Sequence, residues 1–298
     1  MSVIYSARRQ ADSEWVGLNG CRCYVRRWAN PGGEKIILLH GWMDCSASFQ
    51  FMVDALSDAW DIYALDWRGM GLSAHQAGGY YDRAVMLSDL SEWLLALSPH
   101  APLHILGHSM GGMLAAQYAG VLPERVKSLI VAEGFGIEDA PIAGGEKKVR
   151  RFLEELQRPQ DFSPTGDYEV FARKLMRRNP ALSLDKALYL SHALLTEDAS
   201  GSLQHRADAR HKIPQPQPYR LEWASYFWKK ITSPVLWVQG EHLPHNEYLN
   251  QIRDTLPQRH AAFGNPPVHT LTGSGHMLQW EAPHKLAAVA EAFWHQHS

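Results

Sequence analysis

Cysteine is scarce in this chain, which has only Cys21, Cys23 and Cys45 among its 298 residues. So few thiols, in an odd number, do not form the disulfide framework typical of small secreted domains. Cys21 and Cys23 are separated by one residue and could supply two ligands of a metal site. No matching second pair of ligands follows in the sequence. The scarcity favours a reducing compartment, so we expect a cytoplasmic protein with no bound metal.

Long hydrophobic runs and a large excess of one charge are missing as well. No apolar segment approaches the roughly 20 residues of a membrane span, and residues 1–10, MSVIYSARRQ, lack the apolar region of a signal peptide. The formal net charge of −2 gives no reason to expect nucleic acid or an anionic membrane as a partner. We therefore expect a small-molecule substrate, while the composition leaves the oligomeric state open.

The chain does contain a large supply of apolar residues, arranged in short segments. Its 45% hydrophobic content and its length fit one large α/β domain with an insertion, or two domains. Alternating residues on either side of Asn19-Gly20 predict a β-hairpin with a type I′ turn, placed at the antiparallel edge of a mostly parallel sheet. Apolar runs predict further strands at residues 35–39, 61–65, 103–106, 126–132, 234–239 and 268–271.

The sequence Gly-His-Ser-Met-Gly at residues 107–111 is the main chemical signal. It lies between a strand-like run and a helix-favouring run, which is the context that a G-x-S-x-G nucleophile elbow requires. Gly107 and Gly111 have no Cβ that would obstruct such a sharp turn. The turn would present Ser109 at the carboxyl edge of the sheet, above a helix N-terminus that favours developing negative charge. Ser109 is therefore the predicted nucleophile.

A His-Gly pair follows the predicted strand at residues 35–39. Acyl transfer needs two N–H donors for the oxyanion of its tetrahedral intermediate. The residue after the nucleophile, Met110, supplies one, and the loop after the third strand supplies the other, here from Trp42. Gly41 would allow close approach of the backbone, and we expect His40 to hold the loop by hydrogen bonding.

Together these segments resemble the α/β-hydrolase superfamily. The motifs that carry the resemblance are HGWMD at 40–44, LDWRGMGLS at 65–73, GHSMGG at 107–112 and GSGHMLQWEAP at 273–283, in the order found in that family. The resemblance implies an eight-stranded, mostly parallel sheet flanked by helices, with a helical cap inserted after strand 6. The core would then comprise residues 1–136 and 232–298, and the cap residues 137–231. No cofactor is implied.

The resemblance also implies a late histidine as general base, in the order nucleophile, acid, base. His276 fits this role, because it lies in a glycine-flanked loop after the last predicted strand. In the loop at residues 65–73, Asp66 and Arg68 are expected to be structural. Their charge-assisted hydrogen bonds would hold this loop near the elbow.

The acid of the triad departs from the commonest pattern of the family. The usual aspartate would lie three residues after Gly240, where this chain has Leu243, a side chain that cannot orient a histidine. Glu133 ends the sixth predicted strand, where some members, such as certain haloalkane dehalogenases, carry their acid. We favour Glu133, with Glu241 as the second candidate and Glu247 as a third.

These residues predict a serine hydrolase that needs no cofactor and cleaves carboxylic ester or thioester bonds through an acyl-enzyme. A serine at the elbow argues against the dehalogenase and epoxide hydrolase branches, which use a carboxylate nucleophile. Two alternatives stay open. One is hydrolysis of a carbon–carbon bond or a lactone by the same triad. The other is a ligand-binding receptor or pseudoenzyme, which Leu243 in place of the usual aspartate would favour.

Overall fold

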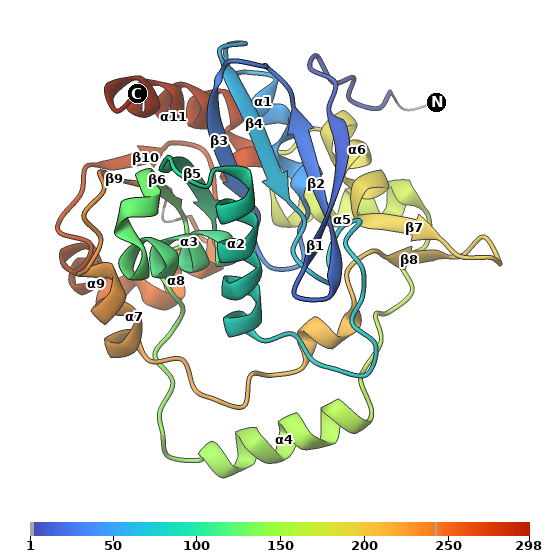
Figure 1. Ribbon diagram of the computed structural model, residues 1–298. Helices are drawn as coiled ribbons and strands as arrows, with labels where there is room; N and C mark the ends of the chain where they lie inside the picture. The colour runs from blue at the N-terminus through green and yellow to red at the C-terminus, as the bar shows by residue number, and fades with distance from the viewer. Residues whose placement is uncertain (1–2, 242) are drawn as a thin grey trace.

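The computed structural model describes residues 3–241 and 243–298 and contains a central sheet of eight strands (Figure 1). The strand order is β1-β2-β4-β3-β5-β6-β9-β10. β1 and β2 form a hairpin, β2 is also antiparallel to β4, and the remaining neighbours are parallel. This confirms the predicted α/β sheet with an antiparallel edge. The strands are β1 (Asp12–Leu18), β2 (Cys21–Trp28), β3 (Glu34–Leu39), β4 (Trp60–Leu65), β5 (Leu103–His108), β6 (Val126–Ala132), β9 (Val235–Gly240) and β10 (Val268–Leu271).

The hairpin at the edge of the sheet turns at the predicted dipeptide. Asn19 and Gly20 both have positive φ angles, 45° and 73°, as a type I′ turn requires. Asparagine and glycine tolerate this conformation better than other residues do. Local sequence therefore sets the register that pairs Leu18 with Cys21.

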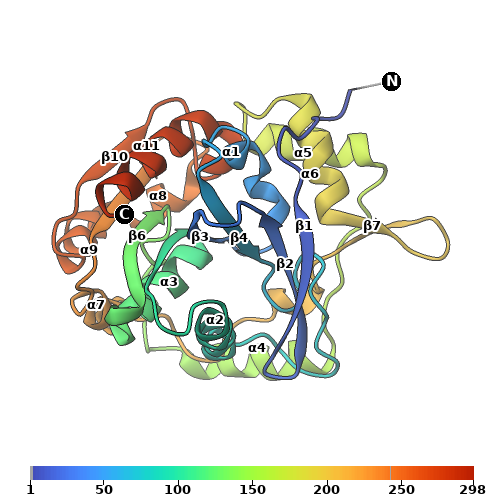
Figure 2. The same cartoon turned by 45° about the horizontal axis from the view of Figure 1, so that its top comes forward.

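Helices cover both faces of the sheet (Figure 2). Successive side chains of a strand point to opposite faces, so Ile37 and Leu39 of β3 join one hydrophobic core, and Ile36 and Leu38 join the other. The first core includes side chains of α2 (Arg83–Leu97), α3 (Met110–Val121) and α7 (Leu221–Trp228). The second includes side chains of α1 (Gln50–Val53), α10 (Leu278–Glu281) and α11 (Pro283–Gln296).

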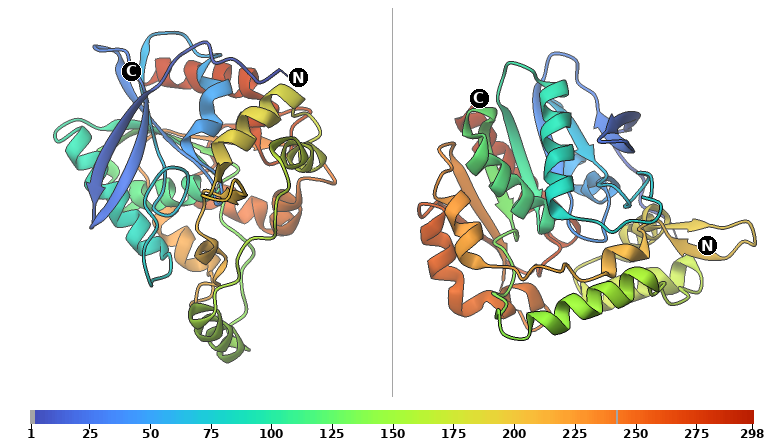
Figure 3. Two further views of the ribbon diagram at one scale, coloured as in Figure 1. Left: turned by 90° about the vertical axis from the view of Figure 1, so that its right-hand side faces the viewer. Right: turned by 60° about the horizontal axis from the view of Figure 1, so that its bottom comes forward.

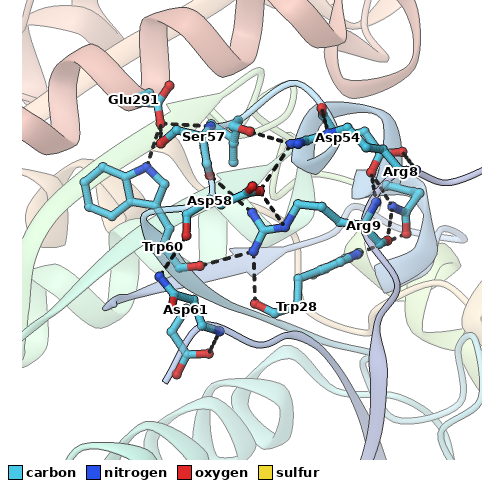
Figure 4. Close-up of polar contacts among 12 residues, drawn as sticks. Arg8, Arg9, Trp28, Asp54, Ser57, Asp58, Trp60, Asp61 and Glu291 are labelled. Atoms are coloured by element: carbon cyan, nitrogen blue, oxygen red, sulfur yellow. Dashed lines mark hydrogen bonds and ion pairs between the residues drawn. The ribbon is translucent and has the colours of Figure 1, made fainter. Parts of the chain in front are cut away.

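Polar contacts tie the chain before β1 to the core (Figure 4). The backbone N–H groups of Arg8 and Arg9 donate to the Asp54 carboxylate at 3.0 and 2.8 Å. In the same region, Glu291 of α11 accepts the indole N–H of Trp60 at 2.8 Å. Trp60 begins β4, so these contacts lie at the amino edge of the parallel strands. They stabilise the end of the sheet opposite to the one where β3, β5, β6 and β9 deliver their loops.

Between β6 and β9 the chain leaves the sheet and forms a largely separate set of elements (Figure 3). The apolar pattern of residues 184–195 predicts a helix, and the structure has one from Leu184 to Leu194. Leu195 then begins a short strand that pairs with a second one. The set consists of α4 (Gly145–Gln157), α5 (Tyr168–Arg178), α6 (Leu184–Leu194), β7 (Leu195–Glu197), β8 (Leu203–His205) and α7.

The last helix of this insertion packs on the core. A Cβ atom on Gly120 of α3 would lie 2.2 Å from the carbonyl oxygen of Phe227 in α7, so the two helices touch backbone to backbone. The division into a core and a cap at residues 137–231 remains a prediction, and α7 lies with the core layer. None of the helices in the described part of the chain has the length and apolar character that crossing a bilayer requires.

Candidate active site

Ser109 sits in a strained turn between β5 and α3. Its φ and ψ angles are 52° and −121°, a conformation that costs free energy in a non-glycine residue. The flanking glycines make the turn possible. A Cβ atom on Gly111 would lie 2.2 Å from the Leu39 carbonyl oxygen, and one on Gly107 would lie 2.5 Å from the Cα atom of Gly112. The turn therefore has the geometry that the spacing of the two glycines predicts.

His276 lies beside Ser109, in the loop after β10. Its Nε2 atom is 3.1 Å from the Ser109 Oγ atom, and its Nδ1 atom is 3.2 Å from Oε2 of Glu133. With the proton on Nδ1, the ring donates to the carboxylate and accepts from the serine hydroxyl. Burial lowers the pKa of His276 to about 4, while the neighbouring carboxylate acts in the opposite direction. The ring is thus neutral and able to accept a proton at neutral pH.

Glu133 directly follows β6 and is fully buried. Its Oε1 atom accepts the Gly240 N–H at 2.6 Å, and its own N–H donates to the Val238 carbonyl at 3.0 Å, so it is fixed against β9. A buried carboxylate needs such partners. Glu241, the second candidate acid, instead accepts the Gly273 N–H at 2.8 Å. Of the candidate acids, the structure brings Glu133 to His276.

Trp42 and Met110, the expected oxyanion donors, line the same cavity as Ser109. Within the described residues, no acceptor is found for either backbone N–H, so both are available to a ligand. The Nδ1 atom of His40 donates to the Gly41 carbonyl oxygen over 2.8 Å. Its Nε2 atom accepts the backbone N–H of Trp67 over 3.1 Å. The predicted role of His40 in holding this loop is confirmed.

Asp66 and Arg68 hold the loop after β4 by charge-assisted hydrogen bonds, as expected. The Asp66 carboxylate accepts the N–H groups of Ser46 at 2.5 Å and Leu72 at 2.8 Å. Arg68 donates to both carboxylate oxygens of Asp89 at 2.5 and 2.6 Å. Asp89 belongs to α2, so Arg68 ties the loop to that helix.

A buried polar chain behind the site could not be foreseen from the motifs. His108 donates from Nε2 to the carbonyl of His276 at 2.8 Å, and its Nδ1 atom accepts from the Gln279 amide at 3.2 Å. The same amide donates to Asp44 at 3.2 Å. Burial raises the pKa of Asp44 to about 7. His108 occupies a variable position of the elbow motif, so the sequence carries no signal for its role.

Tyr248 is a further neighbour of His276 without a sequence signal. Its ring centroid lies 4.7 Å from that of His276, and its hydroxyl accepts the Phe135 N–H at 2.6 Å. Tyr248 packs against the imidazole and restricts its motion.

A cavity of about 360 Å³ opens beside Ser109. Part of its wall comes from the insertion between β6 and β9, including His211 and Ile213. Tyr81 stacks on His211 with 3.7 Å between ring centroids, and the indole N–H of Trp42 donates to the His211 carbonyl at 3.2 Å. These contacts fix the insertion over Ser109.

Comparison with known proteins identifies the family. The family model described as the alpha/beta hydrolase fold matches residues 35–283. The chain belongs to this family. An alpha/beta hydrolase of this kind combines the observed sheet with a nucleophile between a strand and a helix.

Two curated relatives illustrate the similarity of this alpha/beta hydrolase. It is 34% identical to a serine hydrolase-like protein of Danio rerio over 180 residues, which are 58% of this chain and 55% of the relative. It is 31% identical to the pimeloyl-[acyl-carrier protein] methyl ester esterase of Aliivibrio salmonicida over 147 residues, 46% of this chain and 51% of the relative. The alignments thus span about half the length of these relatives.

Among solved structures, the thioesterase domain from the curacin biosynthetic pathway has a similar fold. The TM-score is 0.83 at 21% sequence identity, and the match covers 95% of this chain and 99% of that domain. At this level of identity the similarity concerns the fold alone.

Proposed function

We propose that this alpha/beta hydrolase is a serine hydrolase that cleaves carboxylic ester or thioester bonds of small acyl substrates. The observation that carries the proposal is the hydrogen-bonded series from Ser109 Oγ to His276 Nε2 (3.1 Å) and from His276 Nδ1 to the Glu133 carboxylate (3.2 Å). Nucleophile, base and acid in this arrangement are the requirements of a catalytic triad.

Acylation uses each of these groups in turn. Ser109 attacks the acyl carbonyl while its proton moves to His276, and Glu133 stabilises the imidazolium that forms. The N–H groups of Trp42 and Met110 donate to the oxyanion. The bond to the alcohol or thiol then breaks, His276 returns the proton to the leaving group, and an acyl-enzyme remains.

Deacylation repeats the sequence with water as the nucleophile. His276 takes a proton from the water, the second tetrahedral intermediate collapses, and the proton returns to the Ser109 oxygen as the carboxylic acid leaves. The similarity to the methyl ester esterase of Aliivibrio salmonicida supports the ester class. Cys21, Cys23 and Cys45 are all free, which supports a reducing, cytoplasmic location.

Hydrolysis of p-nitrophenyl esters from acetate to octanoate tests the proposal. We expect wild type to be active and Ser109→Ala to lose activity by several orders of magnitude. A fluorophosphonate should label the wild type and fail to label this variant. A folded wild type that hydrolyses none of these esters would contradict ester hydrolysis and bring the carbon–carbon hydrolase and receptor alternatives forward.

A further inference from the structure

Arg83 is a charged residue of the cavity that the proposed reaction does not use. It is the first residue of α2 and lines the same cavity as Ser109. The wall of the same cavity also includes the apolar side chains of Met86, Met113 and Ile137. Burial removes water from the Arg83 guanidinium, and this loss of hydration is unfavourable unless a partner compensates it.

Among the residues that the structure describes, the Arg83 guanidinium takes part in no hydrogen bond or ion pair, and only the longer-range electrostatic influence of Tyr219 and Asp82 favours its charge. The adjacent carboxylate, Asp82, is occupied. It caps α2 by accepting the Ala84 N–H at 2.6 Å, and its other oxygen accepts the Tyr80 hydroxyl at 3.0 Å. The N–H groups of the Arg83 guanidinium are therefore left for a ligand.

Lys212, another basic residue of this cavity, differs from Arg83 in that its charged group already has partners. Lys212 also lines the cavity, but its ammonium donates to the Asp161 carbonyl at 2.9 Å and lies 4.8 Å from the centre of the Phe162 ring. Burial lowers the pKa of Arg83, which reflects its lost hydration. An arginine nevertheless stays charged at neutral pH because its ordinary pKa exceeds about 12.

We propose that Arg83 forms a carboxylate-binding subsite, so that the ester or thioester substrate carries a free carboxylate that pairs with the guanidinium while Ser109 attacks the carbonyl. The planar guanidinium donates two parallel hydrogen bonds to the two oxygens of a carboxylate. The cavity of about 360 Å³ suits a small substrate of this type. The catalytic part of this statement rests on the proposed function, whereas the subsite rests on Arg83 itself.

Matched ester pairs test the subsite. The methyl monoesters of adipate and suberate carry a carboxylate at the far end of the acyl chain, and methyl hexanoate and methyl octanoate are their neutral counterparts. A butyryl ester of γ-hydroxybutyrate places the carboxylate on the alcohol half instead. Each is assayed with wild type, Arg83→Gln and Arg83→Lys, and with Arg150→Gln as the control, because Arg150 is exposed on α4.

We expect wild type to prefer at least one of the charged esters over its neutral counterpart, and the preferred half of the substrate shows where the carboxylate lies. Arg83→Gln should lower kcat/KM for that ester by about 10- to 100-fold, mostly through KM, and change the neutral esters less than about threefold. Arg83→Lys should retain part of the preference. Equal loss on charged and neutral esters, or no preference in wild type, would overturn the proposal.

Binding measurements separate the subsite from the reaction. Calorimetry with suberate and the Ser109→Ala variant should give a Kd that rises at least about 10-fold when Arg83→Gln is added. If wild type hydrolyses no ester but suberate binding still depends on Arg83, the proposed reaction fails and the subsite stands. If esters are hydrolysed but neither rates nor binding depend on Arg83, the subsite fails and the reaction stands.

Discussion

The carboxylate of Glu133 lies 3.2 Å from the imidazole of His276, although 143 positions separate the two residues in the chain. The contact is possible because β6, which Glu133 follows, pairs with β5 on one side and β9 on the other. The carboxyl end of β6 therefore lies beside the elbow, which follows β5, and beside the loop that follows β9. In this chain the residue after the sixth strand brings a carboxylate to His276, whereas in the commonest pattern of the family the carboxylate comes from the loop after β9.

The first prediction concerns this carboxylate. Glu133→Gln keeps the size of the side chain but removes the charge that stabilises the imidazolium, so kcat should fall by about 10³- to 10⁴-fold. Glu241→Gln is the matched control, because Glu241 accepts a backbone N–H and does not contact the histidine. Steady-state ester hydrolysis distinguishes the two. If Glu241→Gln lost activity and Glu133→Gln retained it, the acid would be wrongly assigned.

A second prediction follows from the pH dependence of the same pair. Only neutral His276 can accept the serine proton, so kcat/KM should rise with pH through the pKa of this residue and then level off. Burial lowers this pKa to about 4, and the Glu133 carboxylate opposes that shift. Glu133→Gln should therefore move the midpoint of the residual activity to lower pH. An unchanged midpoint would show that the carboxylate does not act on the base.

A third prediction concerns Asp44, which is buried behind the site. Burial raises its pKa to about 7, so the folded protein keeps a proton that the unfolded chain has already released above about pH 4. Its contribution to stability is full at low pH and is lost as the pH rises through about 7. Asp44→Asn cannot ionise, so its Tm relative to wild type should increase by roughly 3–6 °C between about pH 5 and about pH 8. A constant difference across this range would contradict the prediction.

A fourth prediction concerns the polar chain through His108. Gln279→Ala removes the amide that donates to both His108 and Asp44. It leaves the buried Nδ1 atom of His108 without a donor, while Asp44 keeps the Ser48 hydroxyl. We expect the free energy of unfolding to fall by about 1–3 kcal/mol. Because His108 holds the carbonyl of His276 at 2.8 Å, kcat should also fall, by about 10-fold, with little change in KM. Normal kcat in a destabilised variant would limit the chain to a structural role.

The glycines of the elbow give a fifth prediction. Gly111→Ala would place a Cβ atom 2.2 Å from the Leu39 carbonyl, so backbone must move and both stability and activity should be lost. Gly145→Ala in α4 is the control, since a Cβ atom there meets nothing within 4 Å. The control should be neutral or up to about 1 kcal/mol more stable, because alanine favours helices. Thermal unfolding and ester hydrolysis measure both effects.

Features that depend only on neighbouring residues could be predicted from the sequence. The hairpin turn at Asn19-Gly20 and the strained elbow at Ser109 follow from local backbone requirements, and both have the expected conformation. Glu133 could be ranked first only by assuming the strand order of the family, because its partner lies far away in the chain. The β7–β8 hairpin could not be predicted, since a three-residue strand is too short to show a period.

The contacts of His108 and Arg83 could not be predicted at all. The role of His108 depends on Gln279, which arrives from another part of the chain. Arg83 resembles any other basic residue at the start of a helix until the cavity around it is known. Such residues are defined by tertiary packing and carry no periodicity or spacing of their own.

The most direct test of the account is mass spectrometry of the protein after reaction with a fluorophosphonate, followed by peptide mapping. The account predicts one covalent adduct on Ser109 in the wild type, none in Ser109→Ala, and much slower formation in Glu133→Gln. A folded wild type that forms no adduct, or forms one on another residue, would contradict the assignment of Ser109 as a nucleophile activated by His276 and Glu133.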